Sequence, residues 1–474
     1  MSKLDIPVRG SAGTAESGPD ATRRSLCIVI DHPGGGATTP RTAAPRRLRI
    51  AQVAPPLERV PPVAYGGTER IVHELTTELV RRGHDVTVFA SGDSEVPTRH
   101  VPTVDRALRP AGIEGDAGDW FAATVKQVLE RATDFDVIHS HLEWWSIPFA
   151  RLSPVPVVAT FHGRLDLPWA DRLLQDAPRG MVAISRHQAH THPGVPWTII
   201  HNGLSLDQAP FENRPGEAFC FVGRVDAEKG IIEAIDIAAG TGRALRIAAK
   251  VGNLARDRAY YEDVFLPALK RAGSLVEYLG EVGPADRDRL FAESYATLMP
   301  GAWPEPFGLV SIESLACGTP ILARRVGALP EIIRDGVDGF FGDDATAMAF
   351  YADRVGALDR RAIRERVVER FSAARMTDRY EELYARMAEA PDPAGPDDGP
   401  NAPLRAAVAI PVIPEPDPDL PPPPAAVIAG MARPGGFGPS RPTPAARPKG
   451  PPSVLARLRS RARGGSARGS HPDR

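Results

Sequence analysis

The chain has 474 residues, of which 42% are hydrophobic and 24% are charged, with a formal net charge of -2. A single hydrophobic core rarely grows beyond roughly 250 to 300 residues, so we expect two domains. The near-neutral charge gives no basis for nucleic-acid binding as the main function, because proteins of that class carry a strongly basic surface.

The cysteines and the lengths of the apolar runs indicate in which cellular compartment the protein is located. Cys27, Cys220 and Cys317 are far apart, odd in number and without metal-ligand spacing, so we interpret them as reduced structural thiols. The N-terminal apolar run 26–30 is too short for a signal-peptide core, and nothing approaches the roughly 18 apolar residues of a membrane span. We therefore expect a soluble, cytoplasmic protein.

The first domain is predicted to span residues 46–210, after a leader over 1–45 whose composition is typical of disorder. Leu75 and Leu79 recur with other apolar residues at helical spacing before Gly83. The predicted strands of this domain are Leu48–Val53, Asp85–Ala90, Phe135–His139, Val155–Thr160, Met181–Ile184 and Trp197–Ile200.

The second domain is predicted over residues 211–370, where alternation of strands and helices begins again. Its predicted strands are Phe219–Val222, Leu245–Ala248, Val276–Leu279, Ala296–Met299 and Pro320–Ala323. Such alternation implies right-handed crossovers and parallel sheets covered on both faces. The predicted fold is therefore α/β, with two Rossmann-like, doubly wound domains that face a central cleft.

Two further segments complete the predicted organisation. Residues 371–390 are expected to form a terminal helix that packs back on the first domain. Residues 391–474 hold 21 of the 49 prolines and end in a basic stretch, so we expect a disordered tail. A solvated tail is the simpler interpretation, although its run 454–463 suggests weak contact with an anionic membrane surface or an acidic partner.

The run from Trp303 to Glu313 places two carboxylates around the start of a predicted helix. Glu305 lies between two prolines that disfavour helical backbone, whereas Glu313 lies inside the helix predicted over Leu309–Cys317. Free amides at such a helix start suit a phosphate, and Glu313 could accept hydrogen bonds from two ribose hydroxyls. A nucleotide sugar has both groups.

Two cations follow the first strand of the second domain. Arg224, after Gly223, and Lys229 could reach one pyrophosphate near a strand end and a helix start. The alternative is that both are ordinary solvated charges beside Asp226 and Glu228.

Gly66 and Gly67 lie between the first strand and the first helix. Two glycines allow the backbone to approach a ligand closely, and the following helix start can face an anion. The alternative is a simple tight turn capped by Thr68. The three-glycine dinucleotide fingerprint is missing from this motif, so we infer no nicotinamide cofactor.

Three histidines follow strands of the first domain. His162, like His139 and His141, is expected to project toward the cleft, where it could donate a hydrogen bond to a sugar hydroxyl or a reacting oxygen. The alternative is that each is a satisfied polar residue of the core. No third ligand at suitable spacing accompanies the pair His139 and His141, so we predict no metal site.

Taken together, these motifs resemble those of family 4 glycosyltransferases with the GT-B fold, over about residues 48–385. The run from Glu305 to Glu313, continued by 316–322 and 327–332, is the most specific of them. The motifs that carry the resemblance are Gly66 to Glu69, Thr160 to Gly163, Ile184-Ser185, Asn202-Gly203, Gly223-Arg224, Lys229-Gly230 and Glu305 to Glu313.

The resemblance implies transfer of a hexosyl unit from a nucleotide-diphosphate sugar, with retention of configuration and without a metal or other cofactor. Catalytic roles would fall to His162, Arg224, Lys229 and Glu305. The implied donor-binding residues are Gly66, Gly67, Gly223, Arg224, Lys229, Val282, Glu305, Pro306, Phe307, Gly308, Leu309 and Glu313. Of these, Glu313 would hold the ribose and Val282 would contact the base through its backbone.

Two other functions fit the same motifs. A nucleotide-sugar epimerase of the same fold could reuse the phosphate and ribose contacts, and a non-catalytic protein could bind a nucleotide sugar. The sequence identifies neither the nucleotide nor the acceptor, which is a sugar, a lipid-linked group or a small molecule. Loops 57–65 and 143–145 are expected to select it, with Trp144 and Trp145 either stacking on a sugar or packing in the core.

Overall fold

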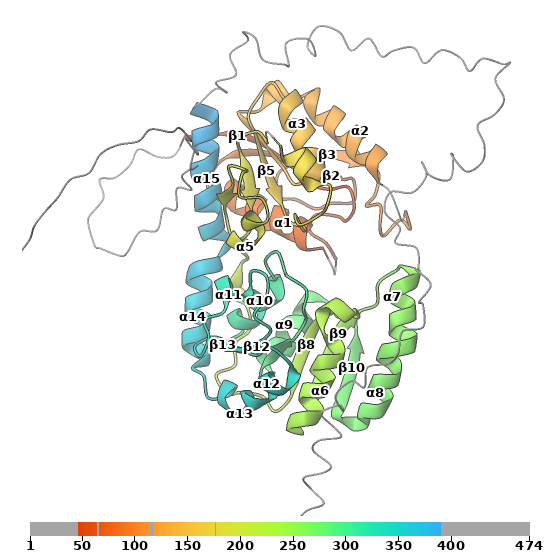
Figure 1. The fold of residues 1–474 in the computed structure, drawn as a ribbon. Coiled ribbons are helices and arrows are strands. Elements are labelled where there is room, and N and C mark those ends of the chain that lie inside the picture. Colours follow the sequence, from red (N-terminus) through yellow and green to blue (C-terminus); the bar gives the residue numbers. More distant parts are fainter. Residues whose placement is uncertain (1–45, 64–65, 114–116, 176, 390–474) are drawn as a thin grey trace, which may run out of the picture.

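A computed structural model describes residues 46–63, 66–113, 117–175 and 177–389, which form two α/β domains one above the other (Figure 1). The predicted leader and tail, and residues 64–65 at the end of the loop 57–65, lie outside the described residues. Within them, no helix is both long and apolar enough to span a membrane.

The first domain is built on a seven-stranded parallel sheet in the order β3-β2-β1-β4-β5-β6-β7. Its strands are β1 (Arg49–Val53), β2 (Asp85–Ser91), β3 (Arg99–Val104), β4 (Val137–Ser140), β5 (Val157–Phe161), β6 (Met181–Ala183) and β7 (Thr198–Ile199). Its helices are α1 (Gly67–Arg81), α2 (Gly118–Leu129), α3 (Ser146–Leu152), α4 (Ala170–Leu174) and α5 (Arg186–His190).

The second domain is built on a six-stranded parallel sheet in the order β10-β9-β8-β11-β12-β13. Its strands are β8 (Phe219–Arg224), β9 (Leu245–Lys250), β10 (Val276–Gly280), β11 (Thr297–Met299), β12 (Ile321–Ala323) and β13 (Gly339–Phe341). The remaining helices are α6 (Ile231–Thr241), α7 (Ala255–Tyr260), α8 (Leu266–Ala272), α9 (Pro284–Ala292), α10 (Leu309–Ala316), α11 (Leu329–Ile332), α12 (Ala345–Phe350), α13 (Ala352–Val355), α14 (Arg360–Phe371) and α15 (Ala373–Glu389).

These two doubly wound parallel sheets confirm the predicted fold class. The central strands β1 and β8 are each paired on both sides, and accordingly Ile50, Ala51 and Val53 of β1 and Phe219 to Phe221 of β8 are buried. The predicted apolar stripe of α1 is also present, since Ile71, Leu75 and Leu79 are all fully buried.

Sequence analysis missed two strands, and both lie at sheet edges. Strand β3 contains Pro102, which cannot donate to a ladder, and most of its side chains are only partly buried. Strand β13 has three residues and begins at Gly339. Edge strands tolerate proline and need no apolar alternation, so neither strand carries the pattern of a buried one.

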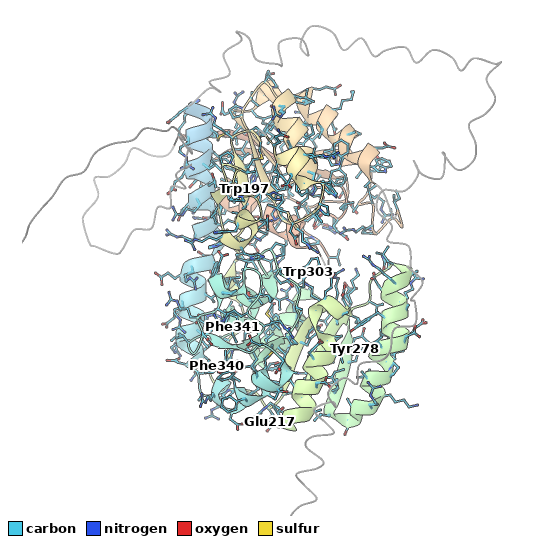
Figure 2. All side chains as sticks on the ribbon, in the orientation of Figure 1. Trp197, Glu217, Tyr278, Trp303, Phe340 and Phe341 are labelled. Carbon is cyan, nitrogen blue, oxygen red and sulfur yellow. The ribbon has the colours of Figure 1, made fainter. Side chains whose placement is uncertain are left out.

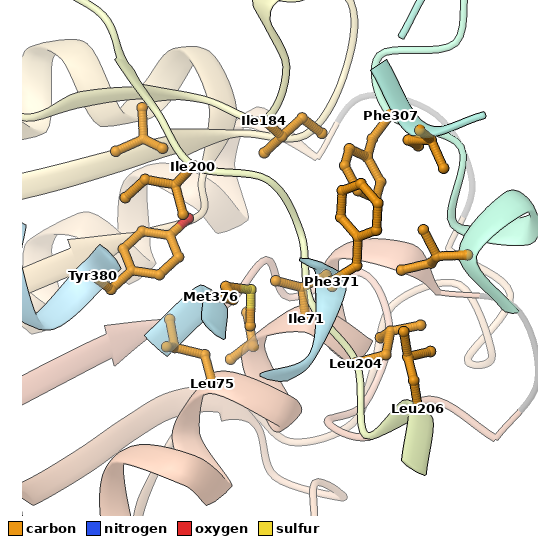
Figure 3. Close-up of a cluster of buried hydrophobic side chains, with 14 of the residues drawn as sticks. Ile71, Leu75, Ile184, Ile200, Leu204, Leu206, Phe307, Phe371, Met376 and Tyr380 are labelled. Carbon is orange, nitrogen blue, oxygen red and sulfur yellow. The ribbon is translucent and has the colours of Figure 1, made fainter. Parts of the chain in front are cut away.

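The chain crosses between the domains twice, and the two crossings are hydrogen-bonded to each other. Leu204 forms a parallel bridge with Ser372, in which the Leu204 N–H donates to the Phe371 carbonyl and the Ala373 N–H donates to the Leu204 carbonyl, at 3.1 and 2.8 Å. Phe371 packs edge-to-face on Phe307 of the second domain, in the same apolar cluster as Ile71 and Leu75 of the first (Figure 3). One apolar cluster therefore joins the two domains.

After the second crossing, α15 lies along the first domain, as the blue helix of Figure 1 shows. Arg82, just after α1, forms ion pairs with Asp378 and Glu381 of α15, and His84 lies 2.8 Å from Glu381. Helix α14 stays on the second domain, where Arg364 donates to the Ala316 carbonyl of α10 at 2.6 Å. The two helices thus clamp the crossing from both sides.

A substitution at Gly203 tests the contact between the two crossings, because a Cβ there would lie 2.3 Å from the Ser372 carbonyl oxygen. We predict that Gly203→Ala lowers the free energy of unfolding by roughly 2 kcal/mol, since the crossings must separate to admit the methyl group. Gly194→Ala is the matched control, because no atom lies within 4 Å of its added Cβ. Urea denaturation measures both, and equal stabilities for the two variants would contradict the tight junction.

Candidate active site

A cavity of about 590 Å³ lies between the domains, lined mainly by segments that follow strands. This is the edge at which parallel α/β sheets bind ligands. Trp303 marks it in Figure 2, on the side of the second domain that faces the first. The predicted site residues that line it are Gly66, Gly67, His162, Gly223, Arg224, Lys229, Glu305, Pro306, Phe307, Gly308 and Leu309.

Lys229 and Glu305 form an ion pair in this cavity, although 76 residues separate them. The turn that carries Lys229 ends at Gly230, which has φ +75° and packs against the backbone of Gly301. A Cβ on Gly230 would lie 2.6 Å from the Gly301 nitrogen. Both the left-handed conformation and the close approach require glycine, and together they hold Lys229 beside Glu305.

Arg224 lies at the end of β8, with its guanidinium 3.4 Å from the Asp226 carboxylate. Its Nε is buried and has no hydrogen-bond partner among the described residues. An unused buried donor is costly, although the rest of this guanidinium is partly exposed toward the cavity that Arg224 lines. This geometry favours an anion in the cavity over an ordinary solvated charge.

Two helix starts from opposite domains meet at the cavity. Gly308, with φ +92°, precedes α10, and Gly67 begins α1. A Cβ on Gly67 would lie 3.5 Å from the Leu309 side chain across the gap. The first amides of a helix have no partner within it, so both starts present donors and positive dipole ends to the same space.

Glu313 and Val282 do not line the cavity that the described residues form. Glu313 is buried behind it, paired with Arg70 of α1 and with Arg287 of α9, the latter at 3.1 Å. Burial would raise the pKa of Glu313, but these two guanidinium groups hold it below its ordinary value. Val282 packs beside the buried cluster that contains Cys220.

His162 lines the cavity, whereas His139 and His141 are fully buried behind it. The side chains of His139 and His141 therefore match the alternative of satisfied core histidines. Burial lowers the pKa of His162 to about 3 and that of His141 well below the ordinary value. All three rings are neutral at physiological pH.

Two carboxylates in the first-domain wall were not among the predicted site residues, although Glu69 belongs to the first glycine motif and Glu143 to the loop expected to select the acceptor. Glu143 has φ +51° and accepts hydrogen bonds from the amides of His162 and Gly163 at 3.0 and 3.1 Å. Burial raises the pKa of each carboxyl to about 7. Carboxyl groups with a strongly raised pKa are typical of functional sites.

The aromatic wall also belongs to the first domain. Trp144 lines the cavity and packs edge-to-face on Phe161 and Trp169, with ring centroids 5.4 and 4.7 Å apart. Trp145 instead stacks on Phe121 and is partly exposed. Of the two predicted aromatic residues, Trp144 thus both supports the core and faces the cavity.

Comparison with known proteins identifies the family. Residues 65–208 match the model described as Glycosyltransferase Family 4, and residues 206–370 match the model described as Glycosyl transferases group 1. The chain belongs to the family 4 glycosyltransferases. It is therefore an enzyme that transfers sugar, and the predicted family is confirmed.

Individual family members are similar over most of the chain. A phosphatidyl-myo-inositol mannosyltransferase of Mycobacterium leprae (strain TN) is 28% identical, covering 68% of this chain and 90% of the relative. A glycogen synthase of Mycobacterium tuberculosis (strain CDC 1551 / Oshkosh) is 26% identical, covering 59% and 79%. AviGT4, a glycosyltransferase involved in avilamycin A biosynthesis, is 26% identical with a TM-score of 0.56, covering 73% and 99%.

The first-domain wall of this glycosyltransferase was the part that sequence analysis left undefined. Glu143 follows β4 by three residues, so its place after a strand was a usable signal, but a single loop glutamate has no diagnostic spacing. No sequence motif indicated a role for Arg70 and Arg287. Both act through their ion pairs with Glu313, from which they are 243 and 26 residues away in the sequence.

The raised pKa of Glu69 predicts how stability depends on pH. The folded state binds this proton more tightly than the unfolded state, whose carboxyl has a pKa near 4.5. The contribution of the Glu69 carboxyl to the free energy of unfolding is therefore complete below pH 4.5 and is lost as pH rises through about 7. We predict that Glu69→Gln flattens the fall in the free energy of unfolding across this range.

Chemical denaturation at several pH values measures the slope. Glu217→Gln, at an exposed position of the second domain, is the control and should keep the wild-type slope. An unchanged slope for Glu69→Gln would contradict the burial of a protonated carboxyl at this position.

Proposed function

We propose that the chain transfers a hexosyl unit from a nucleotide-diphosphate sugar to an acceptor hydroxyl, with retention and without a metal ion. The observation that carries the proposal is the convergence of Arg224, Lys229 and two helix starts on one cavity between the domains. Four independent sources of positive potential there suit a diphosphate.

The electrostatics of the reaction support these roles. Cleavage of the anomeric C–O bond leaves a cation-like sugar and a nucleoside diphosphate that gains negative charge. Arg224 and Lys229, together with the amides at Leu309, would stabilise that leaving group as its charge develops. These fixed charges would meet the demand that a divalent cation meets in other enzymes.

Binding of the donor would replace one partner in each of two ion pairs, Lys229 with Glu305 and Arg70 with Glu313. Its diphosphate would take Lys229 from Glu305, which frees that carboxylate to accept hydrogen bonds from the donor sugar. Its ribose would compete with Arg70 for Glu313, which lies just behind the cavity wall. Arg287 would keep Glu313 ionised during the exchange.

Retention follows in this proposal from the same-face geometry of the family. The departing phosphate oxygen would take the proton of the acceptor hydroxyl, so the reaction needs no strong side-chain base. His162 would then contact the sugar rather than abstract a proton, in keeping with its low pKa. The acceptor would enter along the first-domain wall, past Leu57 and Trp144.

A protein that shares this fold has been solved with a nucleotide sugar, the donor class proposed for this chain. HepE of Anabaena, whose structure was determined in complex with UDP-glucose, shares this fold at a TM-score of 0.57 and 17% identity, covering 72% of this chain and all of that one. A cytoplasmic location and contact of the basic tail with membranes stay predictions, the latter outside the described residues.

Lys229→Ala tests the diphosphate contact. We predict that it lowers kcat/KM about 100-fold, roughly 2.7 kcal/mol, because the lost charge stabilises the leaving group. Lys270→Ala, at an exposed position of α8, is the control and should retain wild-type turnover. The assay follows nucleoside diphosphate release across a panel of nucleotide sugars and acceptors.

Two results would contradict the proposal. Wild-type turnover by Lys229→Ala would remove the diphosphate assignment. Isomerisation of the sugar nucleotide in the absence of any acceptor would instead identify an epimerase.

Metal independence has its own test. We predict that turnover of the purified enzyme is unchanged by excess EDTA, because Arg224 and Lys229 supply the positive charge. Loss of activity in EDTA, with recovery on adding Mg²⁺ or Mn²⁺, would show that a cation is required.

A further inference from the structure

A chain of buried hydrogen bonds runs from the terminal helix α15 to His162. His162 Nε2 lies 2.9 Å from His141 Nδ1, and His141 Nε2 lies 3.0 Å from Gln52 Oε1. The Gln52 amide nitrogen donates to the Tyr384 hydroxyl at 3.2 Å. His141, Gln52 and Tyr384 are all fully buried, so water does not compete for these bonds.

The amide of Gln52 sets the direction of the whole chain. Its oxygen carries no hydrogen, so His141 must donate through Nε2. A neutral imidazole has one N–H, which leaves His141 Nδ1 as an acceptor. His162 therefore donates to it through Nε2, and its own Nδ1 carries no proton.

This assignment requires one N–H on each of His141 and His162, so both rings must be neutral. Burial lowers the pKa of His162 to about 3, and the pKa of His141 is also far below its ordinary value. The Nδ1 of His162 has no hydrogen-bond partner among the described residues and is not among the buried, unpartnered atoms. It is the ring nitrogen that a ligand in the cavity can reach.

We infer that Gln52, with its amide nitrogen bonded to Tyr384, positions His162 in the Nε2–H tautomer, so that Nδ1 accepts a hydrogen bond from a hydroxyl of the bound sugar. The choice of sugar as the partner rests on the proposed function. Gln52 and Tyr384 are positioning residues, since neither lines the cavity. If the Gln52 amide were reversed, each bond would reverse, and His162 would present a donor instead.

This chain of hydrogen bonds gives the second crossing between the domains a role in the reaction. Tyr384 lies 245 residues beyond His139 and comes from the helix that returns to the first domain. A helix that carries no residue of the cavity lining would thus decide whether the sugar meets an acceptor or a donor.

A side branch of the network supplies a matched control. The Tyr384 hydroxyl also lies 2.6 Å from His139 Nδ1, and His139 Nε2 lies 2.7 Å from Thr160 Oγ1. Thr160 in turn bonds the Tyr380 hydroxyl at 2.9 Å. Tyr380 is also a fully buried tyrosine of α15, but it lies off the path from Gln52 to His162.

The test is ¹⁵N NMR of the full chain labelled at histidine, with the His162 signals assigned by their loss in His162→Asn. We expect wild-type His162 to be protonated at Nε2 and bare at Nδ1. In Tyr384→Phe we expect a mixture of tautomers and a kcat lower by about tenfold, the worth of one hydrogen bond. Tyr380→Phe should keep both the tautomer and the rate within about twofold of wild type.

A proton on Nδ1 in the wild-type protein would overturn the inference without any variant. Equal tautomer populations in Tyr384→Phe and wild type would also overturn it, and Gln52→Met gives a second variant if Tyr384→Phe does not fold. A shifted tautomer in a chain that turns over no nucleotide sugar would support the positioning of His162 and defeat the proposed function, so the two failures are distinguishable.

Discussion

The chain crosses between its two sheets twice, and a parallel bridge between Leu204 and Ser372 binds the crossings together. The absence of a side chain on Gly203 permits this approach, and the aromatic contact between Phe307 and Phe371 seals it on the side of the second domain. Because both crossings are fixed, the starts of α1 and α10 face each other across a short gap. The same constraint returns α15 to the first domain, where its tyrosines reach the strands behind His162.

Charges in the cavity and just behind it are balanced by partners from distant parts of the chain. Lys229 is paired with Glu305, and Glu313 is paired with Arg70 from the opposite domain. Paired charges avoid the cost of isolated ions in a partly buried space. In the proposed reaction, the donor diphosphate would take the place of Glu305 at Lys229, and the ribose hydroxyls would take the place of Arg70 at Glu313.

Local patterns predicted what depends on local chemistry. The buried strands, the glycine turns and the placement of Glu305 before a helix start follow from apolar runs and backbone preferences within a few residues. The edge strand β3 was missed because Pro102 and partial exposure break that pattern. The burial of Glu313, the raised pKa of Glu143 and the bond from Tyr384 to Gln52 depend on contacts between residues far apart in sequence, which no spacing within a motif encodes.

The most direct test of the inter-domain site is a crystal structure of the chain with a nucleoside diphosphate. The diphosphate should lie between the Arg224 guanidinium and the amides at the start of α10, with Lys229 turned from Glu305 toward a phosphate oxygen. The ribose should lie at Glu313, in place of Arg70. A diphosphate bound elsewhere, with the ion pair of Lys229 and Glu305 intact, would contradict the assignment of this cavity as the donor site.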